Sequence, residues 1–232
     1  MNLVRRPNGP FGLIDHLHGL QSLVAKWWGR PTSGMLTDLI IAGSPVIFLH
    51  NPKTGGKSLR DFLHVKRSSH TFASERLSSG QWHATFSIAA VRQPFERFLS
   101  GYYDRILGAA ENGLVKMYGP EIKKISPFEF LEVIELNPKF SGRQIQWTDY
   151  PSSTKPRADL ILRHETIGTW KEQMLQAGLD VSSRSFPHLN RSKRAEANHL
   201  ETLKMSPEDF ARLELAVKDY FRCDYEAFGY PL

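Results

Sequence analysis

The sequence contains a single cysteine, Cys223, among its 232 residues. One thiol excludes an internal disulfide framework and a zinc site built on cysteines, and it is typical of chains that mature in a reducing compartment. The chain also lacks any run of about eighteen apolar residues, so no membrane-spanning helix is predicted. The N-terminal region lacks the continuous apolar stretch and the small-residue cleavage site of a secretory signal. These absences together predict a soluble, cytoplasmic protein.

The composition is that of a folded protein with a basic surplus. Hydrophobic residues make up 41% of the chain and aromatic residues 11%, which is enough for one large core and excludes intrinsic disorder. The net charge of +6 indicates an anionic partner. Nucleic acid, acidic glycan, anionic lipid and a phosphorylated cofactor satisfy this charge equally, so charge alone does not choose among them.

The first 44 residues differ from the rest of the chain. Apolar residues recur at near-helical spacing between Leu13 and Trp28, which predicts an amphipathic helix that docks on the main body. A role at a membrane surface is the alternative for this helix. We therefore divide the chain into an N-terminal helical extension, residues 1–44, and a main domain, residues 45–232.

In the main domain, apolar runs alternate with helical patterns. The runs at 45–50, 85–91 and 158–163 are continuous rather than alternating, as expected of strands buried on both faces of a parallel sheet. Helices are predicted at 56–67, 94–107, 127–136, 166–178 and from Ser206, a good N-cap before Pro207, to about residue 221. This alternation predicts an α/β fold with a central, mostly parallel sheet flanked by helices.

The segment HNPKTGGKS, residues 50–58, lies between the first apolar run and the first predicted helix. A loop in this position exposes unpaired backbone N–H groups beside the positive end of the helix dipole, and it therefore attracts phosphate-like anions. Glycines let the backbone approach the ligand, lysines add charge, and hydroxyls donate hydrogen bonds. The predicted binding residues are Pro52, Lys53, Thr54, Gly55, Gly56, Lys57 and Ser58. An ordinary glycine-containing turn is the alternative reading of this segment.

A second motif follows the second apolar run. In VRQPFERFLSGYYD, residues 91–104, Arg92 stands at the end of the predicted strand. Ser100 comes eight residues later, about two turns into the helix that Pro94 begins. Taken alone, Arg92 is equally suited to a surface ion pair, and Ser100 to a small packing position.

The two motifs together resemble those of sulfotransferases that use 3′-phosphoadenosine 5′-phosphosulfate (PAPS), in the group containing heparan and chondroitin sulfotransferases and bacterial relatives. FLHNPKTGGKSLR is similar to the family pattern H-x-P-K-T-G-G-T-S, except that Lys57 replaces a threonine. VRQPFERFLSGYYD is similar to V-R-[DN]-P-x-x-R-x-x-S-x-Y. The resemblance implies a three-layer, P-loop-like fold in which the first loop grips the 5′-phosphosulfate. It also implies that Arg92 and Ser100 contact the 3′-phosphate.

Fainter similarities continue to the C-terminus. LILRHETIGTWKEQM resembles a strand and helix of the family, with Glu165 near the sheet edge. FPHLNRSKR, residues 186–194, resembles a late basic loop that closes over the 3′-phosphate, which implies that Arg191, Ser192, Lys193 and Arg194 are donors. DYFRCDYEAFGY resembles the terminal packing element of the family. The resemblance covers about residues 45–230.

The implied chemistry is transfer of a sulfuryl group between two oxygens, for which the protein supplies positioning, charge neutralisation and a base. Lys53 is the candidate for stabilising the leaving phosphate, and no metal is expected. His70 is the first candidate for the general base that accepts the hydroxyl proton, with His83 and Glu75 as alternatives.

The acceptor is expected to be a hydroxyl on a carbohydrate or a small metabolite. The polar-aromatic segment that contains Arg143, Gln144, Gln146, Trp147 and Tyr150 suits either a sugar site or the end of a surface helix.

Two other functions compete with this interpretation. Gly56-Lys57-Ser58 also ends the phosphate loop of kinases and nucleotide triphosphatases, although Asn51 stands where that motif has its first glycine. Such an enzyme needs a carboxylate at the end of an apolar strand to organise Mg²⁺, and Asp159 stands at a strand's start instead. The basic residues at 184–194 favour a non-enzymatic binder of nucleic acid or acidic glycan. No nucleic-acid-binding motif is present, so a nucleic-acid partner is not expected.

Overall fold

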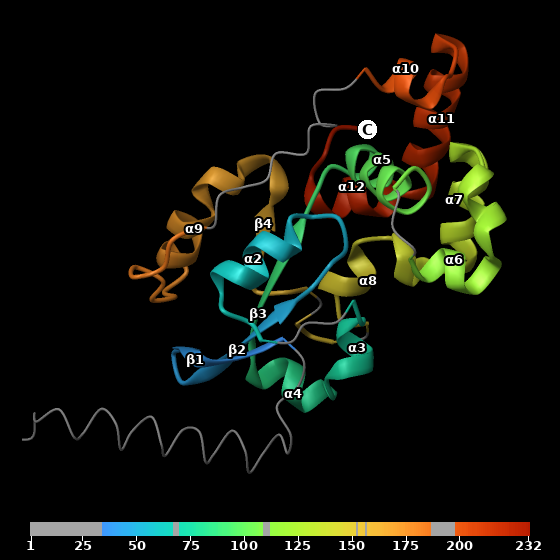
Figure 1. Ribbon diagram of the computed structural model, residues 1–232. Coiled ribbons are helices and arrows are strands. Elements are labelled where there is room, and N and C mark those ends of the chain that lie inside the picture. The colour runs from blue at the N-terminus through green and yellow to red at the C-terminus, as the bar shows by residue number, and fades with distance from the viewer. Residues whose placement is uncertain (1–33, 67–69, 109–111, 152, 156, 187–197) are drawn as a thin grey trace, which may run out of the picture.

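The computed structural model describes residues 34–66, 70–108, 112–151, 153–155, 157–186 and 198–232 (Figure 1). In these ranges the strands are β1 (Met35–Ile41), β2 (Ser44–Leu49), β3 (Phe86–Val91) and β4 (Leu160–Arg163). The α-helices are α2 (Gly56–Phe62), α3 (Ala73–Arg76), α4 (Ser79–Ala84), α5 (Pro94–Arg105), α6 (Gly113–Tyr118), α7 (Pro127–Leu136), α8 (Ile145–Thr148), α9 (Trp170–Gln176), α10 (His199–Leu203), α11 (Pro207–Tyr220) and α12 (Arg222–Phe228). Short 3₁₀ helices are η1 (Pro120–Lys124), η2 (Pro138–Phe140) and η3 (His164–Thr169).

The four strands form one sheet in the order β1-β2-β3-β4. β1 pairs with β2 in the antiparallel sense, whereas β2, β3 and β4 are parallel. The carboxyl ends of these three strands therefore meet at one edge of the sheet, which we call the carboxyl edge, and their amino ends meet at the opposite amino edge. The prediction of a mixed α/β fold with a mostly parallel sheet is confirmed, and the finer assignment to a P-loop-like class stays a prediction.

The first strand changes the expected layout of the N-terminal region. The expected boundary after residue 44 falls within β2, directly after its first residue, Ser44. Ser44 pairs with Ile41 of β1, so the boundary would divide the β1–β2 hairpin. The sheet therefore begins at β1 and not at Pro45. The amphipathic helix expected between Leu13 and Trp28 lies outside the described residues.

The sheet is covered on both faces because successive side chains of its strands point in opposite directions. Val46 and Phe48 of β2 pack in one core with residues of α2 and α9. Ile47 and Leu49 pack in another with residues of α3 and α4, among them Trp82. Burial on both faces explains why these strands read as continuous apolar runs.

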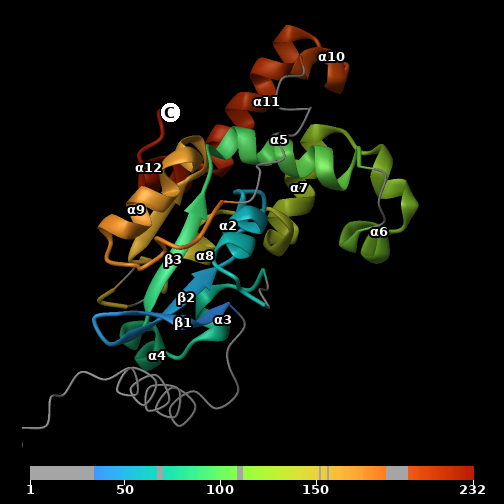
Figure 2. The same ribbon diagram turned by 60° about the vertical axis from the view of Figure 1, so that its left-hand side comes forward.

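A separate group of helices covers the region beyond the carboxyl edge. α5, α6, α7, α11 and α12 contribute to a third core, which we call the helical cluster. Figure 2 shows α5, α6, α7, α10 and α11 grouped to one side of the sheet, beyond the tips of the strands. Pro94 begins α5, and the side chain of Gln93 accepts a hydrogen bond from the Glu96 N–H, so the first turn of α5 is capped. α5 thus has one end at the carboxyl edge and its body in the helical cluster.

The predicted helices are present, with shifted ends in several places. The prediction for 127–136 matches α7, and Ser206 caps α11 through the Asp209 N–H. α2 ends at Phe62, five residues before the expected end, and the helix predicted from residue 166 begins as the 3₁₀ helix η3. None of the described helices is long and apolar enough to cross a membrane.

Candidate functional site

The loop at residues 50–55 connects the carboxyl end of β2 to α2 (Figure 1). Gly55, the N-cap of α2, has a φ of 81°, and Lys53 has a φ of 67°, so both adopt the left-handed conformation. A Cβ at Gly56 would lie 2.4 Å from the ring of His50, so a larger residue would not fit. Within the described residues, the N–H groups of Lys53, Gly55 and Gly56 meet no backbone acceptor. The loop therefore presents unpaired donors that suit a phosphate-like anion.

The remaining loop residues are used in different ways. Asn51, Pro52 and Thr54 are buried, whereas Lys57 is exposed and Ser58 is half-buried. The Thr54 hydroxyl donates to the carbonyl oxygen of Asn51 at 2.9 Å. This hydroxyl therefore closes the loop on itself.

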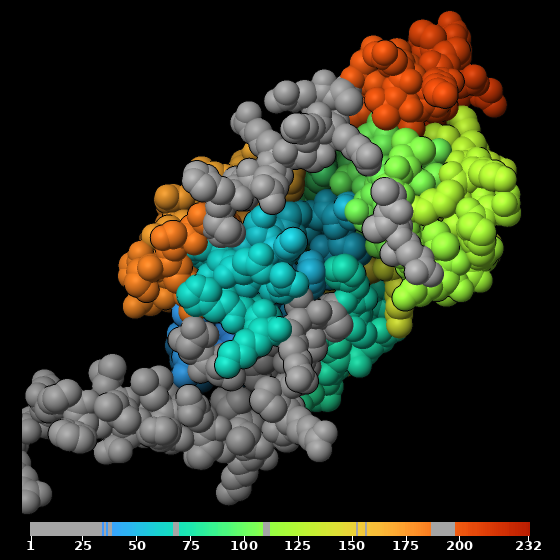
Figure 3. All heavy atoms as spheres, in the orientation of Figure 1, coloured from blue at the N-terminus to red at the C-terminus, as the bar shows by residue number. Residues whose placement is uncertain are grey.

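The side chain of Lys53 lies between the loop and α5. Its ammonium is 3.4 Å from the carboxylate of Asp104, and the lysine side chain is 24% exposed. Burial lowers the pKa of Lys53, the Asp104 carboxylate raises it, and the cations of Arg105 and Arg92 lower it further. In Figure 3, blue atoms of this part of the chain lie recessed between the cyan atoms of α2 and the green atoms of α5. Lys53 is thus a partly buried cation that is paired with a carboxylate of α5.

Arg97 of α5 holds this loop from beneath. Its side chain is 0% exposed, and its Nε donates to the carbonyl oxygen of Pro52 at 2.9 Å. Nη2 donates to Oδ1 of Asn51 at 3.1 Å, and Nη1 donates to the carbonyls of Ser141 and Gly142. Burial lowers the pKa of Arg97 to about 10, so the guanidinium remains charged at neutral pH.

Gln144 connects the loop to the end of β3. Its Oε1 accepts from the N–H of Arg92 at 2.9 Å and from Nδ2 of Asn51 at 3.3 Å. Its Nε2 donates to the carbonyl of Arg92 at 2.8 Å. The backbone N–H of Gln144 donates in turn to the buried carboxylate of Asp224. One buried amide thus fixes the spacing between the two motifs that the sequence analysis singled out.

This role overturns one reading of the segment that contains Gln144. Gln144 and Trp147 are both 0% exposed, so neither side chain lines a sugar site. Arg143 donates to the carbonyl of Tyr220, and Tyr150 donates to the carbonyl of Leu77. The segment supports the site from the interior.

Arg92 lies at the carboxyl edge, directly after β3. Its guanidinium pairs with Glu96 one turn into α5, with 3.2 Å between nitrogen and oxygen. The field of Arg92 is one of the smaller causes of the lowered pKa of Lys53. Ser100 is half-buried on α5. It is three residues after Arg97 and four before Asp104, a spacing that places it on the helix face that meets the loop.

His70 lies against His50, the residue directly after β2. The two Nε2 atoms are 3.4 Å apart, and the rings meet edge to face. Burial lowers the pKa of His70, and the cations of Arg105, Arg97 and Lys53 lower it further. Burial also lowers the pKa of His50 to about 3. Both imidazoles are therefore neutral at physiological pH, and His70 is within the electrostatic reach of Lys53.

The structure places His83, another candidate base, away from this group. His83 belongs to α4 near the amino edge, and its Nε2 contacts the hydroxyl of Ser153 at 3.0 Å. Glu75 pairs with Lys139 at 3.0 Å. The expectation that His83 competes with His70 is therefore wrong, because it lies at the other end of the sheet.

Of the remaining predicted residues, Glu165, which follows β4, is described by the structure. Oε1 of Glu165 accepts from the N–H of Gln93 at 2.7 Å, and Oε2 accepts from the hydroxyl of Tyr230 at 3.0 Å. Glu165 thus joins the carboxyl edge to the C-terminal segment, where a packing role was expected. The predicted donors Arg191, Ser192, Lys193 and Arg194 lie outside the described residues.

Sequence reasoning did not identify Arg97 or Asp104, and it placed Gln144 in a sugar site or at the end of a surface helix. Arg97 is the second arginine of the quoted motif, and its spacing from Ser100 and Asp104 was the available signal for a shared helix face. Gln144 carried no comparable signal. Its importance depends on partners that are far away in sequence.

The requirements of a kinase are poorly met by the described residues. Asp159 directly precedes β4 at the amino edge, and its Oδ2 accepts from the N–H and the hydroxyl of Ser87. Glu165 at the carboxyl edge already accepts two hydrogen bonds. Within the described ranges, no group of three or more His, Cys, Asp or Glu side chains could hold a metal ion.

An α/β sheet whose carboxyl edge carries a glycine-containing, lysine-bearing loop beside an arginine defines an anion-binding protein of the α/β class. A family model described as the sulfotransferase family matches residues 48–231, and the chain therefore belongs to that family. Membership supports sulfotransfer as the general activity. Comparison with curated proteins and with solved structures gives no match.

Proposed function

We propose that this protein transfers the sulfuryl group of PAPS to an acceptor hydroxyl, on a carbohydrate or a small metabolite. The observation that carries the proposal is the link through Gln144, which holds the lysine-bearing loop and the Arg92 turn side by side. PAPS carries an anionic phosphosulfate at its 5′ position and a phosphate at its 3′ position, so it needs two such anion sites at a fixed separation. Membership of the sulfotransferase family supports the same conclusion.

In this proposal the loop binds the 5′-phosphosulfate. Among the described residues, the N–H groups of Lys53, Gly55 and Gly56 have no backbone acceptor, and they can donate to the phosphosulfate. Lys57 is exposed and adds positive charge at the rim. Arg92 and Ser100 bind the 3′-phosphate, and so do Arg191, Ser192 and Arg194. The burial of Thr54 leaves its hydroxyl to hold the loop.

Lys53 and His70 supply the chemistry. His70 is held neutral by its lowered pKa, so it can take the proton from the acceptor hydroxyl as the oxygen attacks sulfur. A new S–O bond forms while the bond between sulfur and the bridging phosphate oxygen breaks. Lys53 neutralises the charge that develops on that oxygen, and 3′-phosphoadenosine 5′-phosphate (PAP) leaves. No metal is required for these steps, and the proton ends on His70.

Calorimetry with PAP tests the proposal directly. We expect the wild-type protein to bind PAP with a Kd of about 1 µM. Failure to bind at concentrations far above micromolar would defeat the assignment. Phosphate release from ATP in the presence of magnesium would instead favour the kinase or nucleotide triphosphatase interpretation. The acceptor class and the cytoplasmic location stay predictions.

A further inference from the structure

Arg97 is a buried cation that is bound mainly to backbone carbonyls. Its guanidinium donates to Pro52, Ser141 and Gly142 carbonyls and to the Asn51 amide oxygen. Among the described residues, no carboxylate lies within ion-pair distance of it. Burying an arginine is costly unless its donors are satisfied. A residue of this kind serves the backbone that it binds.

One of these bonds determines where a loop N–H points. The carbonyl of Pro52 and the N–H of Lys53 belong to one peptide unit, which is planar and trans. In such a unit the two groups point in opposite directions. Because the Pro52 carbonyl points toward Arg97 beneath the loop, the Lys53 N–H points away from it. That N–H meets no backbone acceptor in the described part of the chain.

The same contact stabilises an unfavourable backbone conformation. Lys53 has a φ of 67°, a left-handed conformation that is unfavourable for residues other than glycine. The loop keeps this conformation because Arg97 binds the two residues that precede Lys53. It donates to the carbonyl oxygen of Pro52 and to Oδ1 of Asn51. Arg97 is itself fixed, since α5 packs in the helical cluster through Phe98 and Leu99.

We propose that Arg97 is a positioning residue for donor binding, which aims the Lys53 N–H at the 5′-phosphate of the donor. This inference rests on the proposed function. It predicts that losing Arg97 weakens the grip on the 5′-phosphate specifically, because Arg92 and Ser100 hold the 3′-phosphate independently of the Pro52 carbonyl. A merely structural arginine would instead affect both ends of the donor equally, through loss of folded protein.

The experiment compares two nucleotides by calorimetry. PAP has a 5′-phosphate, and adenosine 3′-phosphate lacks one. Arg97→Lys keeps the positive charge and loses the fork of donors. We expect it to weaken the binding of PAP about tenfold. Its affinity for adenosine 3′-phosphate should change less than about twofold. Equal weakening of both nucleotides, or no weakening of either, would overturn the inference.

Trp82→Phe is the matched control, because Trp82 is equally buried and its indole donates to the carbonyl of Lys155 at the amino edge, away from the loop. We expect it to lower the melting temperature about as much as Arg97→Lys while leaving both affinities unchanged. A selective loss of PAP affinity in the control would overturn the inference. If Arg97→Lys does not fold, Arg97→Gln, which keeps a polar side chain but loses the fork of donors, replaces it, and a selective loss of PAP affinity of about tenfold is again expected. Wild-type protein that does not bind PAP would overturn the proposed function itself.

Discussion

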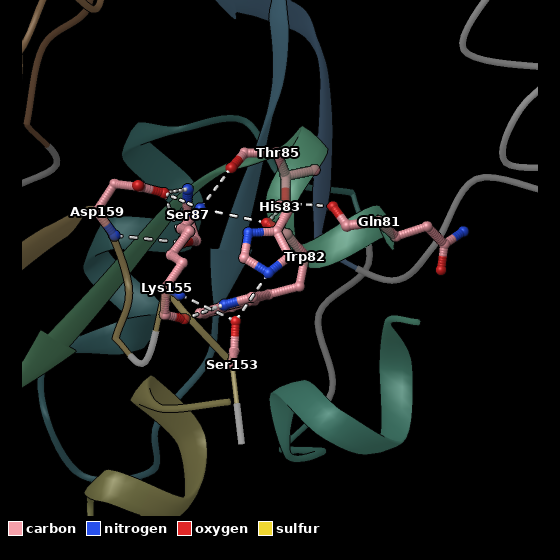
Figure 4. A network of polar contacts seen from close by, with 8 residues as sticks. All are labelled: Gln81, Trp82, His83, Thr85, Ser87, Ser153, Lys155 and Asp159. Atoms are coloured by element: carbon pink, nitrogen blue, oxygen red, sulfur yellow. Dashed lines mark hydrogen bonds and ion pairs between the residues drawn. The ribbon is translucent and has the colours of Figure 1, made fainter. Parts of the chain in front are cut away.

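The two edges of the sheet use polar residues in opposite ways. At the amino edge, Lys155 donates to the carbonyls of Trp82 and Thr85 and pairs with Asp159, which also accepts from Ser87 (Figure 4). The indole of Trp82 donates to the carbonyl of Lys155 at 2.6 Å. The charges and donors of this network satisfy one another, so the network stabilises the amino edge of the sheet.

At the carboxyl edge, the polar groups of the described residues do not all satisfy one another. Lys53 and Arg92 each face one partly exposed carboxylate, Asp104 and Glu96, while the N–H groups of Lys53, Gly55 and Gly56 have no backbone acceptor among the residues that the structure describes. Burial lowers the pKa of His70, and the nearby cations of Arg105, Arg97 and Lys53 lower it further. Polar groups that satisfy one another contribute to stability, whereas groups that lack partners are available for a ligand. The comparison thus separates the structural end of the sheet from the functional end.

The largest expected effect comes from removing the lysine at each edge. Lys53→Ala should lower the transfer rate about 10³-fold with little change in stability, because the ammonium acts on the leaving group. Lys155→Ala should leave the rate within about twofold and lower the free energy of unfolding by about 1–3 kcal/mol, because it leaves buried carbonyls unpaired. Transfer assays and urea unfolding measure both quantities. Equal loss of rate in the two variants would remove the distinction between the edges.

The histidines provide the next comparison. His70→Asn should lower the rate about 10²-fold. In the wild type the rate should rise with pH through the pKa of His70, which lies below its ordinary value, and then stay level as the neutral base predominates. This acid limb should disappear in the variant. His83→Asn, at the amino edge, should leave the pH–rate profile unchanged, and an altered profile there would reinstate it as a candidate.

A smaller effect is expected from the arginines, and it concerns affinity. Arg92→Ala should weaken the binding of PAP about tenfold or more, because a charge-assisted hydrogen bond to the 3′-phosphate is lost. The rate at saturating donor should fall much less. The control is Arg157→Ala, which breaks the pair with Asp149 near the start of β4. Calorimetry that finds equal PAP affinities for the two variants would show that Arg92 does not bind the donor.

The smallest effect is expected from the acidic partners. Asp104→Asn should tighten PAP binding about threefold, because Lys53 no longer has to leave a solvent-exposed ion pair. Asp159→Asn should leave PAP affinity unchanged and lower the melting temperature, since its carboxylate accepts from Ser87 and pairs with Lys155. Calorimetry and thermal unfolding check the pair. Weaker PAP binding in Asp104→Asn would contradict the role given to this ion pair.

Much of the sheet could be predicted because its signal is local. β2, β3 and β4 are short continuous apolar runs, and Pro94, Pro127 and Pro207 mark the first turns of helices. β1 escaped prediction because its sequence, MLTDLII, contains Thr37 and Asp38 and has no continuous apolar run. Only its pairing with β2 identifies it as an edge strand.

The candidate site was predictable in its loops and not in its supports. Lys53 and Arg92 stand directly after predicted strands, and parallel strands bring such positions to one edge. Arg97 and Gln144 are residue types that are usually exposed, and yet both are completely buried. Nothing local distinguishes them from surface residues.

The sequence by itself determined the order of strands and helices, the sharp loop at Gly55 and Gly56, and the class of anion that the loop suits. These properties depend on side-chain periodicity and on the conformational freedom of neighbouring residues, which act over a few positions. Only the tertiary structure decided that Arg97 supports Pro52 from 45 residues away, and that His70 and His83 lie at opposite ends of the sheet. Burial and hydrogen-bond partners depend on segments that are distant in the chain and meet only when it folds.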